Sequence, residues 1–187
     1  RIESKLGAGG MGVVYKAHDS TLSRPVALKV LTASSVANAE RERRFVQEAK
    51  AASSLNHPNI VTIYAINSAD LDGEPVRYIA MEFIDGEPVR PTDHIRKLLG
   101  IALQIADGLS AAHSAGIIHR DLKPSNVLVA ETDERWVSKV IDFGLARPAD
   151  DRSADVAQWR SQTSAVGTPH YMSPEQAGGR TRDVGTP

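Results

Sequence analysis

A short segment, HRDLKPSN at 119–126, gathers a carboxylate, a cation and an amide within a few positions. Phosphoryl transfer needs a carboxylate that orients the attacking hydroxyl, cations near the phosphates and oxygen ligands for a divalent metal. Asp121 can accept the hydroxyl proton, Lys123 can neutralise the transferring phosphate, and Asn126 offers an amide oxygen to a metal. The spacing of these residues therefore predicts a phosphoryl-transfer site.

A second segment, DFG at 142–144, adds another carboxylate. Asp142 and Asn126 together supply hard oxygen ligands, the type that suits Mg²⁺, with Mn²⁺ as the alternative. No His-rich or carboxylate cluster in the sequence indicates a different metal. His119 follows the apolar pair at 117–118, so we expect it to be a core histidine rather than a base or a metal ligand.

A glycine-rich segment, GAGGMG at 7–12, has the spacing that lets backbone amides approach phosphate oxygens without a Cβ in the way. The spacing of Gly7, Gly9 and Gly12 is weak evidence alone, because a flexible hairpin turn explains it equally well. A dinucleotide fingerprint would open a helix, whereas VVY at 13–15 continues as a strand. We therefore expect a hairpin that covers phosphates.

A lysine lies within the alternating strand VALKV at 26–30. Lys29 shares a strand face with Ala27, so a cation is presented among apolar neighbours. Glu48 can pair with Lys29 and thereby let the position of a helix decide whether the lysine is aimed at phosphates. The alternative is a weak surface pair between Glu48 and Arg44 on the same helix.

The elements that must position these residues divide into two groups. Before Asp85, hydrophobic periodicity predicts a small sheet and one helix. That helix has an apolar stripe at Phe45, Ala49 and Ala52. The expected elements are a hairpin region within 5–30, the helix at 37–54, and strands at 60–66 and 76–83 separated by a turn at 70–73.

After Asp85 the pattern becomes mainly helical. A helix at 94–115 is expected to end at Gly116, which suits the left-handed stop that terminates many helices. Its apolar stripe comprises Ile95, Leu98, Ala102, Ile105, Leu109 and Ala112. Short strands are expected at 117–118, 127–129 and 137–141, with a turn at 131–134 and a long loop at 148–166 that is functional or disordered.

Composition limits the partners of the chain. The 187 residues carry a net charge of −1, which provides no field to attract nucleic acid or an acidic membrane. No apolar run approaches the roughly 18 residues that span a bilayer. The sequence has 0 Cys, which excludes disulfides and a cysteine nucleophile and weakly suggests a reducing compartment. We expect a cytoplasmic chain that is a fragment of a longer protein, and the parent could still carry a membrane anchor.

The motifs together resemble the eukaryotic-like (Hanks-type) serine/threonine protein kinases, most closely their bacterial branch. They are GAGGMGVV, VALK, the helix residue Glu48, HRDLKPSN, DFG and GTPHYMSPEQ at 167–176. The resemblance implies an α+β, two-lobed kinase fold with ATP bound between the lobes. The N-lobe would span 1–85, and 86–187 would form a C-lobe that is incomplete. The buried helix that follows the SPE element in this family is not present after Glu175, so the stripe at 94–115 is expected to lack a packing partner.

The resemblance also implies a role for each matching residue. Asp121, Lys123, Lys29 and Glu48 would be catalytic, and Asn126 and Asp142 would bind Mg²⁺. Met81 would be the gatekeeper, and the backbones of Glu82 and Ile84 would form the hinge. The remaining nucleotide contacts would be Gly7, Gly9 and Gly12 over the phosphates and Val14, Ala27 and Leu128 around the adenine.

Regulation would act through charge on the loop before the SPE element. Arg120, and Arg147 with it, would pair a phosphate there. Thr163 is the preferred phosphosite, with Ser164 and Ser161 as rivals, and Thr168 in GTP matches the serine/threonine pattern. The expected partners are protein substrates with Ser or Thr acceptors, and a second copy of the chain during autophosphorylation.

Two other functions are compatible with the motifs. One is an ATP-binding regulatory module without transferase activity, resembling a pseudokinase. The other is a small-molecule phosphotransferase of related fold, which Lys123 and the long segment ending in SPE disfavour.

Overall fold

A computed structural model describes residues 1–9, 12–31, 46–47, 49–50, 52–71, 74–132, 135–143, 147–148 and 169–177. The chain divides into two compact units. The first comprises Arg1–His57 and Val61–Asp85, and the second comprises Pro58–Ile60 and Gly86–Pro187.

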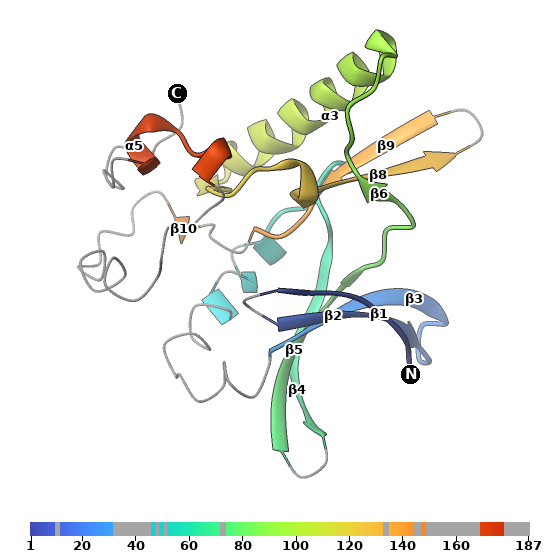
Figure 1. The fold of residues 1–187 in the computed structure, drawn as a ribbon. Coiled ribbons are helices and arrows are strands. Elements are labelled where there is room, and N and C mark those ends of the chain that lie inside the picture. The colour runs from blue at the N-terminus through green and yellow to red at the C-terminus, as the bar shows by residue number, and fades with distance from the viewer. Residues whose placement is uncertain are drawn as a thin grey trace. The chain divides into compact units, whose positions relative to one another are not determined.

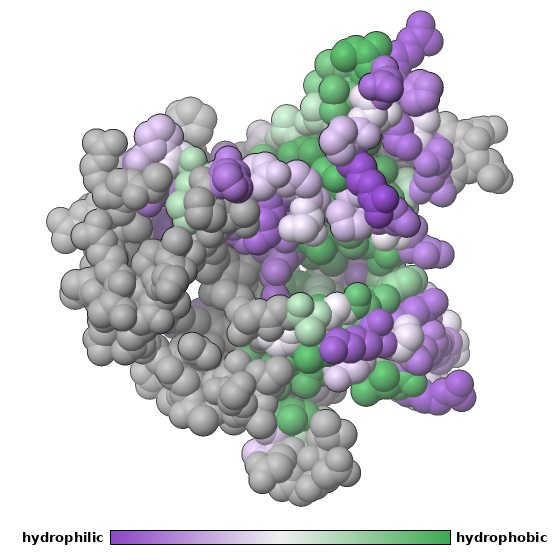
Figure 2. All heavy atoms as spheres, viewed as in Figure 1, coloured by the Kyte–Doolittle hydropathy of each residue, from purple (hydrophilic) through white to green (hydrophobic). Residues whose placement is uncertain are grey.

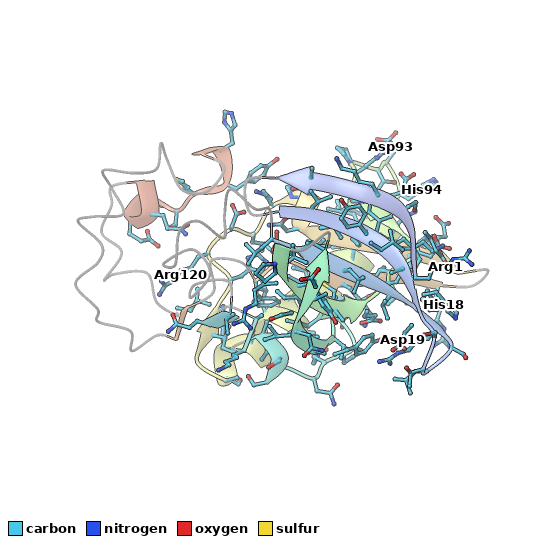
Figure 3. All side chains as sticks on the ribbon, turned by 90° about the horizontal axis from the view of Figure 1, so that it is seen from below. Arg1, His18, Asp19, Asp93, His94 and Arg120 are labelled. Carbon is cyan, nitrogen blue, oxygen red and sulfur yellow. The ribbon has the colours of Figure 1, made fainter. Side chains whose placement is uncertain are left out.

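The first unit contains a five-stranded antiparallel sheet with the strand order β1-β2-β3-β5-β4 (Figure 1). Its strands are β1 (Ile2–Gly9), β2 (Gly12–Asp19), β3 (Arg24–Val30), β4 (Ile63–Leu71) and β5 (Glu74–Glu82). Alternating and β-branched residues favour β2, β3, β4 and β5, in the regions where the sequence predicts strands, whereas β1 extends further toward the N-terminus than the predicted hairpin region. Asp19 closes the β2–β3 turn, because its Oδ1 accepts hydrogen bonds from the backbone N–H groups of Thr21 (3.0 Å) and Leu22 (3.2 Å). The labelled residues Arg1, His18 and Asp19 lie together at this end of the sheet (Figure 3), and the terminal amine of Arg1 donates to the carbonyl of His18 at 2.8 Å.

Gly12 occupies a position that only glycine fits. Its φ of +147° lies where side chains are strained, and a Cβ there would approach the carbonyl oxygen of Val30 to 2.1 Å. Gly12 pairs with Gly9 across the β1–β2 ladder. The prediction that the glycine-rich segment belongs to a hairpin rather than to a strand–helix turn is therefore confirmed.

The core of the first unit forms where helical residues cover one face of the sheet. Residues 46–47, 49–50 and 52–53 are helical, and Ala49 and Ala52 are buried, as the stripe predicts. Ala49 packs with Leu31 and Ile79, and partly buried hydrophobic residues surround them, namely Val46, Ile63, Ile66 and Met81. The rest of the predicted helix, including Phe45 and Glu48, lies outside the described residues.

The strand predicted at 60–66 begins later than expected. Its first part makes a different contact, because Ile60 forms an isolated parallel bridge with Val140 and the Val140 N–H donates to the carbonyl of Asn59 at 2.8 Å. At the other end, β4 and β5 extend into the predicted turn at 70–73, since Asp70 pairs with Pro75 and Leu71 pairs with Glu74. Cross-strand pairing here overrides the local preference of Asp for turns.

The second unit combines helix α3 (Ile95–Ser114) with two small sheets. One sheet has the order β6-β8-β9 and the other pairs β10 with β7. These strands are β6 (Glu87–Pro88), β7 (Ile117–Ile118), β8 (Val127–Thr132), β9 (Arg135–Val140) and β10 (Arg147–Pro148). Two 3-10 turns at Pro124–Asn126 and Pro169–Tyr171 and the short helix α5 (Pro174–Ala177) complete the described elements. Strands β6 and β10 were not predicted. The predicted turn at 131–134 is shorter, because Glu131 and Thr132 belong to β8.

Helix α3 ends at Ser114, and Gly116 just beyond it has the predicted left-handed backbone, with a φ of +73°. Its buried face matches the predicted stripe only in part, because Ala112 is buried as predicted, whereas the other buried residues, Ile101 and Gly108, lie outside the stripe. The apolar side chains near the start of the helix are exposed, namely Ile95, Leu98, Leu99 and Leu103. Figure 2 shows this hydrophobic surface at the end of the molecule where α3 begins.

A polar network explains which face of α3 is buried. The Gln104 Oε1 accepts hydrogen bonds from Asn59 Nδ2 (3.0 Å) and from the Ser138 N–H (2.8 Å). Gln104 Nε2 donates to the carbonyl of Trp136 at 2.9 Å, and Asn59 Nδ2 also donates to the carbonyl of Ser138 at 2.9 Å. Gly108 allows close approach, since a Cβ there would lie 3.1 Å from the Asn59 carbonyl oxygen. Helix α3 therefore faces β9 through hydrogen bonds and small residues rather than through its leucines.

Candidate active site

The loop between β7 and β8 brings two of the predicted catalytic residues, Asp121 and Lys123, together with the predicted metal ligand Asn126. Lys123 Nζ lies 2.7 Å from Asp121 Oδ2, and Asn126 Nδ2 donates to the same oxygen at 3.3 Å. Asn126 Nδ2 also donates to the Asp121 carbonyl at 2.8 Å. The 3-10 turn at Pro124–Asn126 folds the chain back, so that residues five positions apart meet. A carboxylate, an ammonium group and an amide therefore converge around one oxygen atom.

The β8–β9 ladder sets the position of Asp142. Val127 pairs with Val140, and the Ile141 N–H donates to the Asn126 carbonyl at 2.9 Å. Asp142 follows Ile141 directly, so Asn126 and Asp142 lie at the same end of this hairpin. The backbone of Asp142 has a φ of +59°, a conformation that non-glycine residues rarely adopt. Such strained residues often occur at functional sites.

The donor set of this loop fits a divalent metal that keeps part of its water shell. The two hydrogen bonds from the Asn126 side chain to Asp121 both use Nδ2, so the side-chain amide oxygen takes no part in them. That oxygen and the Asp142 carboxylate are hard ligands of the kind that Mg²⁺ accepts together with water and substrate phosphates. Among the described residues, no group of three or more His, Cys, Asp or Glu side chains is arranged to hold a metal by itself.

His119 links the predicted catalytic loop, residues 119–126, to the DFG segment. Its side chain is only 2% exposed, as expected for a core histidine. One ring nitrogen, Nε2, lies 3.0 Å from the Ile141 carbonyl oxygen, and Nδ1 accepts a hydrogen bond from the Asp121 N–H at 3.3 Å. These partners assign the neutral tautomer that carries its proton on Nε2. Burial lowers the pKa of His119, which keeps the ring neutral.

The contact between His119 and Phe143 was not anticipated from the sequence. The two ring centroids lie 4.7 Å apart, and the rings are tilted by 45°. Phe143 is itself buried. The sequence shows that Phe143 follows Asp142. It does not show that Phe143 contacts His119, because His119 lies in a different segment and the β8–β9 ladder brings the two together.

The first unit places several predicted nucleotide contacts on one sheet face. Val14 pairs with Lys29, and Ala27 pairs with Met81. Directly opposed residues in antiparallel strands project to the same side, as do residues two apart on one strand. Val14, Ala27, Lys29 and Met81 therefore share a face.

The predicted hinge follows this sheet. The Glu82 N–H donates to the Thr62 carbonyl at 2.9 Å, and Glu82 Oε2 accepts from the Thr62 N–H at 3.2 Å. Ile84 lies just beyond β5 and is partly buried. In the second unit, Leu128 lies on β8, is partly buried and pairs with Lys139.

Several predicted residues belong to segments that the structure does not describe, and two predicted regulatory arginines are described at least in part. Glu48, Ser161, Thr163, Ser164 and Thr168 lie outside the described residues. The backbone of Arg147 is described, and it pairs with Ile118, the residue that precedes His119. Arg120 has a φ of +63° and is partly buried.

A model of the protein kinase domain matches residues 1–186. The chain belongs to the protein kinase family. It is 41% identical over 185 residues to a probable serine/threonine-protein kinase of Streptomyces coelicolor, covering 96% of this chain and 27% of that protein. It is 39% identical over 185 residues to the serine/threonine-protein kinase PknB of Mycolicibacterium smegmatis, covering 96% of this chain and 29% of that protein. The kinase chain therefore spans about a third or less of the length of these relatives.

A solved kinase domain supports the same assignment of fold. The crystal structure of a double mutant of the PknI kinase domain of Mycobacterium tuberculosis matches with a TM-score of 0.61 and 30% identity. The match covers 78% of this chain and 58% of that chain. The predicted protein-kinase-like fold and the predicted bacterial serine/threonine branch are confirmed. The relatives are named kinases, which disfavours a module without transferase activity. Within the described part of the chain, no helix has the length and apolarity needed to cross a membrane.

Proposed function

We propose that the protein containing this chain is a serine/threonine protein kinase that transfers the γ-phosphate of ATP to Ser or Thr hydroxyls of protein substrates. The observation that carries this proposal is the convergence of Lys123 and Asn126 on Asp121 Oδ2. The family implies ATP and a divalent metal, and the hard oxygen donors favour Mg²⁺, with Mn²⁺ as the alternative.

Asp121 is the group that we assign to the acceptor hydroxyl. Its Oδ2 is held by Lys123 and Asn126, so Oδ1 is the atom we assign to the hydroxyl proton. As the proton moves to Asp121, the hydroxyl oxygen bonds to the γ-phosphorus, the bond from that phosphorus to the bridging oxygen breaks, and ADP leaves. Phosphoryl transfer of this kind depends mainly on positioning and on charge stabilisation.

Lys123 and the metal would balance the charge of the phosphate. The ammonium group of Lys123 lies beside Asp121 and can therefore meet the phosphate as it approaches the hydroxyl. Asn126 and Asp142 would hold the metal, which supplies positive charge to the phosphate oxygens. Asp142 would reach it from the end of β9, where the ladder fixes its backbone.

We assign the nucleotide to the shared face of the sheet in the first unit and to the glycine-rich hairpin. Residues 1–85 would act as the N-lobe and 86–187 as the C-lobe, with the hinge at Glu82 and Ile84. Lys29, oriented by Glu48, would bind phosphates, and Met81 would be the gatekeeper. The other assigned contacts are Gly7, Gly9 and Gly12 over the phosphates and Val14, Ala27 and Leu128 around the adenine.

Regulation by loop phosphorylation is part of the same proposal. Arg120 stands beside the catalytic carboxylate, and Arg147 is paired through its backbone with the strand that leads into it. A phosphate on Thr163, or on its rivals Ser161 and Ser164, would be paired by these cations. Thr168 supports the preference for Ser and Thr acceptors.

The direct test is phosphate transfer by the intact protein. Labelled ATP and Mg²⁺ should label the protein itself or a generic basic protein, and EDTA should abolish the labelling. Asp121→Asn should reduce turnover by about 10³-fold or more, because the proton acceptor is lost. Asp93→Asn makes the same change at an exposed site and should have no effect. Normal turnover by Asp121→Asn would contradict the assignment.

A second measurement separates transfer from binding. ATP with Mg²⁺ should raise the melting temperature of the intact protein, and Lys29→Met should remove most of this shift. ATP-dependent stabilisation without any transfer to proteins would instead indicate a regulatory module. Transfer to metabolites but not to peptides would indicate a small-molecule phosphotransferase.

A further inference from the structure

The short helix α5 is closed by a reciprocal capping box. The Ser173 N–H donates to Gln176 Oε1 at 3.1 Å, and the Gln176 N–H donates to Ser173 Oγ at 3.4 Å. This pattern normally needs only the acceptor oxygen of the fourth residue, so a Glu serves as well as a Gln. The amide nitrogen of Gln176 is therefore not required by the cap.

That nitrogen reaches the catalytic loop instead. Gln176 Nε2 donates to the carbonyl oxygen of Arg120 at 2.8 Å, across 56 positions of sequence. The cap fixes Oε1, and a planar amide with one end fixed has little freedom at the other end. The cap thus holds the donor toward Arg120.

The acceptor belongs to the peptide group that immediately precedes the catalytic carboxylate. This group joins Arg120 to Asp121, and its N–H donates to His119 Nδ1 at 3.3 Å. Its carbonyl and its N–H are therefore held from opposite sides, by Gln176 and by His119. Hydrogen bonds that share one peptide group also polarise each other in the strengthening direction.

The backbone at this peptide needs such support. Arg120 has a φ of +63°, which costs a residue with a Cβ about 1–2 kcal/mol. A conformation of this kind persists only where the surroundings hold it. Rotation of the 120–121 peptide plane would turn the Cα–Cβ direction of Asp121 and carry its carboxylate away from Lys123 and Asn126.

We propose that Gln176 is a positioning residue that sets the direction of the Asp121 carboxylate by holding the 120–121 peptide plane. The inference rests on the proposed function of Asp121, and it assigns Gln176, within the Ser173–Ala177 segment, a positioning role beyond capping. The segment and the catalytic loop are thereby coupled, so a displacement of α5 lowers activity without any contact between α5 and the nucleotide.

Two single substitutions separate the cap of α5 from the hydrogen bond between Gln176 Nε2 and the Arg120 carbonyl, which we call the clamp. Gln176→Glu keeps the acceptor for the Ser173 N–H but replaces the donor with an oxygen that faces the Arg120 carbonyl. Ser173→Ala removes the Oγ half of the cap and leaves the Gln176 donor in place. In the intact protein, Gln176→Glu should lower kcat about tenfold while the KM for ATP changes by less than about twofold. Ser173→Ala should leave kcat within about twofold of the parent value, whatever it does to the melting temperature.

Hydrogen exchange gives a readout that does not depend on activity. The N–H of Asp121 should exchange about tenfold faster in Gln176→Glu than in the parent, and Ser173→Ala should not change it. Gln176→Met removes the donor without adding a charge, and it should accelerate the same exchange if Gln176→Glu does not fold.

The outcomes keep this inference apart from the proposed function. Faster exchange at Asp121 in a protein that shows no phosphate transfer would support the clamp and contradict the kinase assignment. Unchanged exchange and unchanged kcat in folded Gln176→Glu or Gln176→Met would overturn the clamp while leaving the kinase assignment intact. An equal loss of kcat in Ser173→Ala, which retains the Gln176 donor, would show that activity depends on the cap of α5 and not on the bond to Arg120, which also overturns the proposal.

Discussion

His119→Phe should destabilise the second unit by an amount that depends on pH. Phenylalanine keeps the ring beside Phe143 but removes both polar contacts of His119. The Ile141 carbonyl, 3.0 Å from Nε2, and the Asp121 N–H, 3.3 Å from Nδ1, would then be left without this partner in a buried site. A buried group that loses its partner costs about 1–3 kcal/mol, and the longer of the two contacts belongs at the low end. We therefore expect a loss of about 2–4 kcal/mol at pH 7.5.

The pH dependence follows from the direction of the pKa shift. Burial lowers the pKa of His119 below its usual value of 6.5, so the folded state favours the neutral ring. The unfolded chain therefore binds a proton at His119 more readily than the folded protein does. The contribution of His119 to the free energy of unfolding is fully present above the pKa of the unfolded chain, and it is lost as the pH falls through the pKa of the folded state. The parent protein loses this contribution in acid, whereas the variant has none to lose. The difference in stability between them should shrink from pH 7.5 to pH 5.5.

Urea unfolding of the parent and of His119→Phe, followed by circular dichroism at both pH values, measures this difference. Other titrating groups are common to the two proteins, so they cancel in the comparison. A stability difference that stays the same at pH 7.5 and pH 5.5, or one smaller than about 0.5 kcal/mol at pH 7.5, would refute the argument.

Four further substitutions test the packing by thermal unfolding. Gly100→Ala should stabilise α3 by about 0.5–1 kcal/mol, since nothing lies within 4 Å of the added methyl group. Gly108→Ala should be less stable than Gly100→Ala, because its Cβ would lie 3.1 Å from the Asn59 carbonyl oxygen. Asn59→Ala should cost about 2–4 kcal/mol, because a part-buried hydrogen bond to Gln104 and a buried one to the Ser138 carbonyl are lost. Gly12→Ala should cost about 2 kcal/mol or more, because a positive φ and a backbone clash coincide there.

Features encoded within one continuous segment could be predicted from the sequence. The HRDLKPSN loop is such a segment, and the meeting of Asp121, Lys123 and Asn126 follows from a turn that Pro124 helps to set. The end of α3 just before Gly116 is another, because a left-handed stop is a property of one residue.

Features that depend on which surfaces meet could not be predicted. The hydrophobic stripe predicted which face of α3 would be buried. The orientation of the helix depends instead on the hydrogen bonds of Gln104 to Asn59 and Ser138, which lie 45 and 34 positions away. Ile60 is a β-branched residue of the kind that favours strands, yet it pairs with Val140 and not with a residue of β5. The S-x-x-Q pattern at Ser173 predicts a helix cap, but nothing in it indicates contact with Arg120.

The β8–β9 ladder also determines where the family can vary in length. Asn126 and Asp142 lie at one end of the hairpin, and Thr132 and Arg135 pair at the other. Extra residues inserted between Thr132 and Arg135 only enlarge a loop, at a small entropic penalty. A single residue inserted within either strand reverses the facing of every side chain beyond it and shifts Asn126 against Asp142. Homologous chains should therefore differ freely in the number of residues at the distal turn while keeping the count from Val127 to Thr132 and from Arg135 to Val140 constant.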